Sequence, residues 1–383
     1  MSRNGICNTS NQCFINATLQ CLASSPFIIE FISKYKIRDD NLIKTITKFN
    51  LGKFKAQDIK TECKKILLEQ LETLNKEEFT ILNQLVKHSY DIFIYISFKE
   101  IMKKIIRNDS NIISNRTFLS IVEELSADSG FEHLFNGEQN DPHEFLAYLL
   151  DKIHNAKSSI VSIEQPENFN ELDVYSQLRF KDFKIRYEKD YSYFVKNLYY
   201  YTLNCIQCSK CTNKSHNVYP NNIICLSLPD LPTITLYDCL NDMFKIDYID
   251  YKCEKCNNTE QNVKEQKLLT EPKTLIFKLI RYANIPNTDR AVKITKKVQY
   301  PKVIDMQKYF CGNNALKTYK LYAVINHSGS MNRGHYYSYV KTLQDDNTTF
   351  NDQWVCCNDE NVNNISEDEA LNSENAYMLF YTL

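Results

Sequence analysis

The sequence lacks a surplus of either charge, a long apolar run and an apolar leader. Lys plus Arg number 46 against 47 Asp plus Glu, which gives a formal net charge of −1. Nucleic-acid binders and polybasic membrane proteins need a basic surplus, so this balance argues against both. The longest apolar run, residues 92–98, is far shorter than a membrane span of roughly 18 residues. Residues 1–5 lack the apolar core of a signal peptide. We therefore expect an intracellular protein of the cytoplasm or nucleus, in a host cell if the gene is viral.

Glycine and proline are also scarce, at 7 and 9 residues, and no tandem repeat or glycine-serine linker marks a domain boundary. A length of 383 residues permits two or three domains, or one large one. Cysteine is frequent by contrast, at 14 residues. In a reducing compartment these cysteines are expected as buried apolar side chains, metal ligands or a nucleophile, in preference to disulfides.

The residue pattern changes along the chain from helical to strand-like. From about residue 26 to residue 135, apolar residues recur three and four positions apart among charges, as in residues 59–74. After about residue 193, runs rich in Tyr, Val, Ile and Leu predict strands. The predicted strands include residues 195–203, 223–228, 274–280, 321–325 and 336–340. A helical half followed by a mostly antiparallel β half predicts an α+β fold.

Cys13 follows a polar, turn-prone stretch and precedes an apolar stretch typical of a buried helix. At a helix N-terminus the positive end of the macrodipole favours the thiolate, which is the reactive form of cysteine. Asn8, five residues upstream, is placed to donate its amide to an oxyanion on a carbonyl that Cys13 attacks. Asn16 and Gln20 share a helix face with Cys13 and extend a polar stripe from its sulfur. Taken alone, Cys13 fits an apolar filler, because free cysteine is among the most buried residue types.

His335 lies at a loop-to-strand junction, where a side chain is held rigidly and can face a cleft. A neutral imidazole there can take the proton of Cys13 and later return it to a leaving amine. Such a base needs a third group to orient it, and the next predicted strand delivers Asn358 and Asp359 at its end. Taken alone, His335 fits a structural histidine and the Asn-Asp pair fits a turn. Only their combination with Cys13 indicates a catalytic triad.

Two Cys-x-x-Cys pairs, Cys208 with Cys211 and Cys253 with Cys256, have the spacing that lets two thiolates reach one Zn²⁺. A single pair is explained by chance, whereas two pairs in a reducing compartment favour a metal site. Four sulfur ligands leave no open position on the metal, so the zinc is expected to be structural, and we expect no cofactor in catalysis. Cys205 also forms a Cys-x-x-Cys with Cys208, and spacing alone leaves open which of Cys205 and Cys211 is the ligand.

A helix is predicted to begin after Asp141, which suits the N-cap, with Pro142 at the first position and Glu144 at the third. The surrounding residues 117–151 include no Lys or Arg. Eight acidic residues lie in this segment: Glu123, Glu124, Asp128, Glu132, Glu138, Asp141, Glu144 and Asp151. They form either an ordinary solvated face or an acidic surface that attracts a basic partner.

Three groups of segments resemble sequence boxes of the ubiquitin-specific proteases, the papain-like deubiquitinases. The cysteine box is matched by Gly5-Ile6-Cys7-Asn8, Cys13-Phe14-Ile15-Asn16 and Leu19-Gln20-Cys21-Leu22. The histidine box is matched by His327-Ser328-Gly329, Gly334-His335-Tyr336 and residues 354–359, and the glutamine-aspartate box by residues 139–146. Because the first two boxes lie in family order near opposite ends, the resemblance covers essentially the whole chain.

The resemblance implies a role for each matched residue. The implied catalytic residues are Cys13 as nucleophile, His335 as base, Asn358 as third triad member, Asn8 as oxyanion-hole donor and Asp359 as the adjacent acidic residue. The implied substrate-binding residues are Gln139, Asp141, His327 and Tyr336, of which Asp141 would hydrogen-bond the extended ubiquitin tail. The implied ligands of a structural zinc are Cys208, Cys211, Cys253 and Cys256.

The same resemblance implies a single papain-like catalytic domain with a helical thumb (about residues 1–190), zinc-tipped β fingers (191–270) and a β palm (271–383). Its expected activity is hydrolysis of the (iso)peptide bond after the C-terminal glycine of ubiquitin, through an acyl-enzyme on Cys13. The alternative is a ubiquitin-binding protein with little or no turnover. The expected partners are ubiquitin and ubiquitinated proteins, with no nucleic acid and no membrane, and the chain is expected to be a monomer.

Overall fold

The computed structural model describes residues 3–34, 76–107, 109, 111–126, 130–284, 291–311, 317–330, 333–344 and 349–383. The helical pattern predicted for residues 59–74 and the acidic residue Asp128 lie outside these ranges. The chain divides into two compact units. The first is formed by Met1–Ser158 and Ile325–Glu367, and the second by Ser159–Val324 and Asp368–Leu383.

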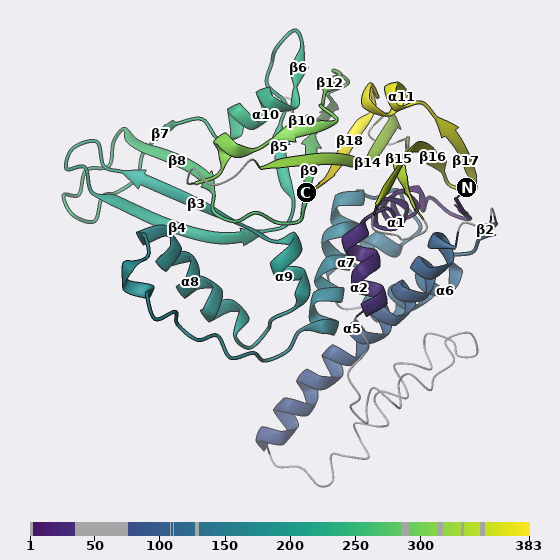
Figure 1. Cartoon of the computed structure of the whole chain (residues 1–383), viewed down its shortest axis with the longest axis horizontal. Helices are drawn as coiled ribbons and strands as arrows, with labels where there is room; N and C mark the ends of the chain where they lie inside the picture. The colour runs from purple at the N-terminus through teal and green to yellow at the C-terminus, as the bar shows by residue number, and fades with distance from the viewer. Residues whose placement is uncertain are drawn as a thin grey trace. The chain divides into compact units, whose positions relative to one another are not determined.

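The first unit combines the N-terminal helices with strands from near the C-terminus (Figure 1). Its helices are α1 (Cys13–Leu22), α2 (Pro26–Lys34), α5 (Lys76–Ile106), α6 (Arg116–Ser126), the 3-10 helix η1 (Glu132–Phe135) and α7 (Pro142–Lys157). Its strands are β1 (Gly5–Ile6), β2 (Ile112–Ile113), β15 (Gly334–Leu343), β16 (Phe350–Asn358) and β17 (Asn361–Ile365). The strands β15, β16 and β17 pair antiparallel in this order, and β1 pairs parallel with β2.

Helix α1 lies in the core of the first unit. All of its residues are buried, and it packs against α7 and β15. The ring of Phe14 meets that of Phe145 on α7 edge-on, with 6.0 Å between centroids. Burial of each large apolar side chain contributes about 1.5–3 kcal/mol, so this packing holds the helix firmly in place.

The second unit is mainly β (Figure 1). Its strands are β3 (Tyr200–Gln207), β4 (Lys214–Asn221), β5 (Ile224–Ser227), β6 (Ile234–Thr235), β7 (Asp247–Ile249), β8 (Asn262–Leu268), β9 (Thr274–Ile280), β10 (Tyr282–Asn284), β11 (Ala291–Lys293), β12 (Val298–Gln299), β13 (Val303–Asp305) and β18 (Ala376–Thr382). Its helices are η2 (Phe169–Glu171), α8 (Val174–Tyr187), α9 (Tyr193–Leu198), α10 (Leu236–Met243), η3 (Gln307–Tyr309) and α11 (Glu367–Leu371), which begins at the boundary. Strand β14 (Thr318–Gly329) passes from the second unit into the first after Val324.

Two sheets organise the second unit. The strands β4, β3, β8 and β7 form an antiparallel four-stranded sheet in this order, with α8 packed alongside (Figure 1). Buried side chains including Tyr187, Tyr201 and Leu203 form the core between this helix and the sheet. Strand β9 pairs antiparallel with β18 and parallel with β5.

Most of the predicted strands are confirmed, because β5, β9, β14 and β15 cover or closely match the predicted ranges. The prediction for residues 195–203 is wrong over its first half, which is the helix α9. Phe194, Val195 and Leu198 are all buried there, at the spacing of one helix face. A short apolar run has no periodicity that separates a buried strand from a buried helix, and tertiary packing decides between them.

Within the described ranges, no single helix combines the length and hydropathy of a membrane span. The helices α1 and α2 meet that test only as a pair, which is bent by 80°.

Candidate active site

Cys13 is the first residue of α1, as the sequence predicts, and its side chain is buried. The residue before it, Gln12, makes no side-chain cap of the helix. Instead, the Oδ1 atom of Asn8 accepts a hydrogen bond of 3.1 Å from the backbone N–H of Gln12. The polar stretch before the cysteine therefore folds back so that Asn8 supports the start of the helix.

The amide of Asn8 is held at both ends. Its oxygen takes the N–H of Gln12, and its Nδ2 donates a hydrogen bond of 2.8 Å to Oδ2 of Asp359. An amide nitrogen carries two N–H groups, so the second can donate to a negatively charged oxygen next to Cys13. The orientation of Asn8 thus suits the predicted oxyanion-hole role.

His335 and Asn358 come from adjacent strands. His335 is the second residue of β15 and Asn358 the last residue of β16. The Nε2 atom of His335 lies 2.6 Å from Oδ1 of Asn358 and 3.8 Å from Oδ2 of Asp359. Of the two acceptors that the sequence leaves open, Asn358 therefore makes the hydrogen bond, and the other ring nitrogen is left for Cys13.

The hydrogen bond between His335 and the Cys13 side chain is the main reason that the pKa of His335 is raised to about 9. Partial burial of the imidazole opposes this rise, while the hydrogen bond to Asn358 and the charge of Asp359 add to it. At neutral pH the imidazole consequently carries a proton. That is the form that stabilises a thiolate on Cys13 and can later protonate a leaving amine.

Asp359 lies in a turn after β16, with a φ of +51°. Its two carboxylate oxygens accept separate bonds, one from Asn8 and one of 2.8 Å from Nδ2 of Asn16 on α1. Its backbone carbonyl accepts the N–H of Ile6 at 2.8 Å. A side chain at Gly5 would collide with the carbonyl of Glu360, so the close approach of β1 to this turn requires glycine.

Asn16 joins the catalytic helix to this turn, a role that the sequence reasoning missed. The available signal was its place on the helix face of Cys13, where it was predicted only to extend a polar stripe. It is buried, as is Gln20 on the same face, whose amide donates to the carbonyl of Asn4 and accepts from Arg3.

Gln139 lies against the residue that precedes His335. Its Nε2 donates a hydrogen bond of 2.5 Å to the carbonyl of Gly334, and its Oε1 accepts the N–H of Gly334 at 3.1 Å. The side-chain amide therefore clamps the start of β15 in the way that a neighbouring strand would. Its predicted contact with substrate stays a prediction.

The other three predicted substrate-binding residues have defined places in the first unit. His327 and Tyr336 are buried, and their rings stack with 4.4 Å between centroids. A side chain at Gly334 would collide with the His327 imidazole. Asp141 is the N-cap of α7, and Oδ1 accepts the N–H of His143 at 2.9 Å. The local prediction for this helix is confirmed, and the substrate contacts remain predictions.

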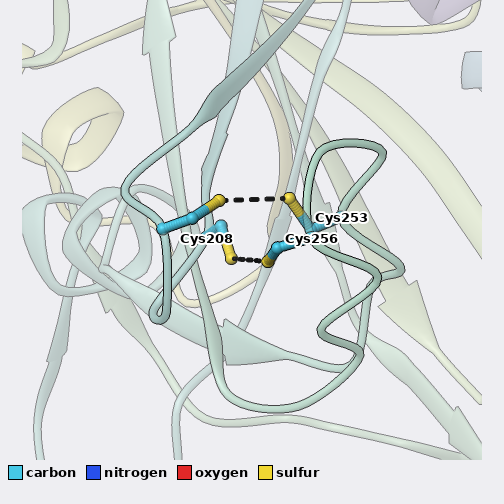
Figure 2. A group of neighbouring side chains, drawn as sticks. Cys208, Cys253 and Cys256 are labelled. Atoms are coloured by element: carbon cyan, nitrogen blue, oxygen red, sulfur yellow. Dashed lines mark hydrogen bonds between the residues drawn. The ribbon is translucent and has the colours of Figure 1, made fainter.

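Four cysteines of the second unit gather into one cluster (Figure 2). They are Cys208, Cys211, Cys253 and Cys256, whose sulfur atoms all lie within 4.8 Å of one another. Two of the sulfur pairs are 3.6 Å apart. A tetrahedral zinc with bonds of about 2.3 Å places its sulfurs about 3.8 Å apart, so the cluster has the dimensions of such a site. Cys205 is a buried residue of β3 outside the cluster, which decides the open choice in favour of Cys211.

The backbone of each cysteine pair is shaped for metal binding. The N–H groups of Thr212 and Asn257 close the two turns onto the carbonyls of Cys208 and Cys253, and both residues have positive φ, at 55° and 58°. The N–H groups of Cys211 and Lys210 lower the pKa of the Cys208 thiol, whereas burial and the neighbouring thiols raise the pKa of the Cys256 thiol. The close grouping of the four sulfurs is what lets these residues hold one metal ion, which binds cysteine as the thiolate.

Comparison with known proteins places this geometry in a family. The family model described as ubiquitin carboxyl-terminal hydrolase matches residues 4–381. The chain belongs to the ubiquitin carboxyl-terminal hydrolase family. This membership confirms the predicted class, a cysteine-type deubiquitinase of the ubiquitin-specific protease group.

Curated members of the ubiquitin carboxyl-terminal hydrolase family resemble the chain to different extents. Ubiquitin carboxyl-terminal hydrolase 25 of Arabidopsis thaliana is 29% identical over 66% of this chain, and the match spans 34% of that relative's length. Ubiquitin carboxyl-terminal hydrolase 8 of Saccharomyces cerevisiae is 23% identical over 99% of this chain and 70% of its own length. A probable family member of Acanthamoeba polyphaga mimivirus is 24% identical, and the match covers 98% of this chain and 89% of the viral one.

Solved structures of the family share the fold. The SAGA Ubp8/Sgf11/Sus1/Sgf73 DUB module bound to ubiquitin aldehyde matches with a TM-score of 0.63 at 20% identity, over 99% of this chain and 69% of that one. A structure of the yeast SAGA DUB module with a variant Sgf73 matches with the same TM-score, over 99% and 68%. With the family match, this likeness confirms the predicted α+β fold of a ubiquitin-specific protease.

Proposed function

We propose that the protein hydrolyses the (iso)peptide bond that follows the C-terminal glycine of ubiquitin, with Cys13 as the nucleophile. The observation that carries this proposal is the connected set of contacts joining Cys13, His335 and Asn358, three residues from separate elements of one unit. A protein that only bound ubiquitin would need neither a paired cysteine and histidine nor an amide to orient the imidazole.

The geometry supports a two-step mechanism. The Cys13 thiolate attacks the carbonyl carbon, and the oxygen that becomes negative accepts the second N–H of Asn8. The His335 imidazolium gives its proton to the leaving amine, the C–N bond breaks, and ubiquitin remains on Cys13 as a thioester. The neutral imidazole then takes a proton from water, which attacks the thioester and releases ubiquitin and the thiolate. Asn358 keeps the ring in plane through both steps.

We propose that the metal of the cysteine cluster is zinc. Four sulfurs in a tetrahedral arrangement are typical of structural zinc, and no coordination position is left for substrate. The metal would tie the turn after β3 to the segment before β8, which gives the end of this sheet a rigid tip.

We also propose that acidic residues near Asp141 steer the basic tail of ubiquitin toward the site. Glu123, Glu132, Glu138 and Glu144 are exposed in the first unit, in a segment without Lys or Arg. Exposed charges act over about 8–10 Å at physiological ionic strength, so kcat/KM for ubiquitin substrates should fall as NaCl rises from 50 to about 500 mM. A kcat/KM that stays constant with salt would show that these residues are only a solvated face.

We propose that ubiquitin and ubiquitinated proteins are the partners, that the chain acts as a monomer without nucleic acid or membrane, and that it works in a reducing compartment. No two cysteines among the described residues are joined by a disulfide bond, which supports the last point.

Hydrolysis of a lysine-linked diubiquitin by the purified protein tests the activity. The wild type should release ubiquitin, Cys13→Ala should release none, and Asn8→Ala should lower kcat by about 10²- to 10³-fold because one oxyanion donor is lost. If the wild type bound ubiquitin but cleaved diubiquitin no faster than Cys13→Ala does, the protein would be a ubiquitin-binding protein with little or no turnover.

A further inference from the structure

Asn115 is a buried polar residue that no sequence box includes. It directly precedes α6 and is 2% exposed. Its backbone carbonyl accepts the N–H of Leu119 at 2.9 Å, which fixes it at the start of the helix. Its side chain turns away from the helix, and Nδ2 donates a hydrogen bond of 2.8 Å to Oδ1 of Asn16.

The bond from Asn115 determines which way the Asn16 amide faces. A primary amide has a donor end and an acceptor end, and rotation by half a turn exchanges them. Nδ2 of Asn16 faces acceptors only, namely Oδ1 of Asp359 at 2.8 Å and the carbonyl of Cys7 at 3.3 Å. The Oδ1 atom must then meet a donor, and Asn115 supplies it. In the flipped orientation Asn16 would set an oxygen against the carboxylate.

The orientation of Asn16 passes to Asn8 through Asp359. Asn16 donates to Oδ1 of the Asp359 carboxylate, so Oδ2 is the oxygen that accepts the hydrogen bond of 2.8 Å from Asn8. The position of the Asn8 N–H groups thus depends on a chain of three hydrogen bonds that begins at Asn115. Each member is wholly or mostly buried, so water competes poorly for these bonds.

We infer that Asn115 is a positioning residue for the oxyanion hole, acting through Asn16 and Asp359 on Asn8. The inference rests on the proposed hydrolase function, because it assigns Asn8 to the oxyanion. A misplacement of about 1 Å at a reacting group costs up to about 10²-fold in rate, so a loosened chain should lower kcat clearly.

The test compares two reactions of Cys13 in Asn115→Asp, an isosteric change that sets an acceptor against Oδ1 of Asn16. Hydrolysis of a ubiquitin amide develops an oxyanion, whereas alkylation by iodoacetamide, followed by mass spectrometry of the Cys13 peptide, does not. We expect kcat to fall about tenfold with KM within about twofold, and the alkylation rate to stay at the wild-type value. Asn363→Asp, the same change at an exposed residue of β17 in the same unit, is the matched control and should leave both rates unchanged.

Asn115→Ala is a second variant in case the aspartate variant folds poorly. It removes the donor without adding a repulsive contact, and we expect the same pattern with a smaller loss of kcat. In an Asn8→Ala background, Asn115→Asp should lower kcat by less than about twofold, because the group it positions is gone. Equal losses in hydrolysis and alkylation, or a full loss in the Asn8→Ala background, would overturn the inference. An inactive wild type would instead overturn the proposed function.

Discussion

At the end of β16, two neighbouring side chains take different partners. Asn358 is the last strand residue and accepts from the His335 ring, whereas Asp359 has entered a turn of positive φ and binds Asn8 and Asn16. The residue pattern left either side chain as the acceptor for the imidazole, and the family resemblance implied Asn358. The backbone reversal between them decides the matter, because it points the carboxylate toward α1.

At the residue scale, the contact between His335 and Cys13 predicts that the pKa of the His335 imidazole depends on Cys13. Cys13→Ala removes the largest cause of the raised pKa of His335. This pKa should therefore fall from about 9 toward its ordinary value near 6.5, as measured by an NMR titration of the labelled imidazole. In the wild type, kcat/KM for an isopeptide should decline as pH rises through about 9, because the imidazole loses the proton that the amine needs. A pKa that stays near 9 in Cys13→Ala would show that Cys13 is not its cause.

At the element scale, sequence reasoning succeeded where a motif coincides with a helix or strand end. The starts of α1 and α7 and the end of β16 were predicted from turn residues, caps and strand pattern. It failed for α9, where a short buried run carries no periodicity. It also had no signal for Asn115, because a polar residue before a helix looks like any N-cap, and its partner Asn16 is 99 positions away.

The start of α7 allows stability and binding to be separated. Asp141→Ala removes the N-cap and should lower the free energy of unfolding by about 1 kcal/mol, measured by urea denaturation. Asp141→Asn keeps a capping oxygen and should stay within a few tenths of a kcal/mol of the wild type, while KM for ubiquitin rises if the carboxylate binds the tail. If Asp141→Ala were as stable as the wild type, the cap would contribute nothing to stability.

At the scale of the whole molecule, the two sets of functional residues belong to different units. The catalytic residues all lie in the first unit and the cysteine cluster lies in the second. The sequence boxes predicted the catalytic set, and the two Cys-x-x-Cys pairs predicted the cysteine cluster. Spacing alone left the choice between Cys205 and Cys211 open, and the family resemblance implied Cys211. The fold places Cys211 in the cluster, because β3 continues through Cys205 and turns only after it.

Because the cysteine cluster and the catalytic residues lie in different units, loss of the metal should lower stability while Cys13 stays reactive. The purified protein should contain one zinc per chain, and Cys211→Ser should lose it and lower the Tm, because a structural zinc contributes directly to folding. Cys205→Ser is the matched control and should keep the metal, as measured by elemental mass spectrometry. Alkylation of Cys13 by iodoacetamide should continue in both variants. Equal loss of zinc from the two variants would contradict the assigned ligand set.

In the proposed mechanism, Cys13 and His335 act together on the C-terminus of ubiquitin. Ubiquitin that carries an electrophile in place of its last residue tests it most directly, with intact-mass and peptide mass spectrometry as the readout. We predict a single covalent adduct, located on Cys13, which is absent in Cys13→Ala and strongly slowed in His335→Ala. A wild-type protein that binds this probe without forming the adduct, or that carries it on another cysteine, would contradict the account.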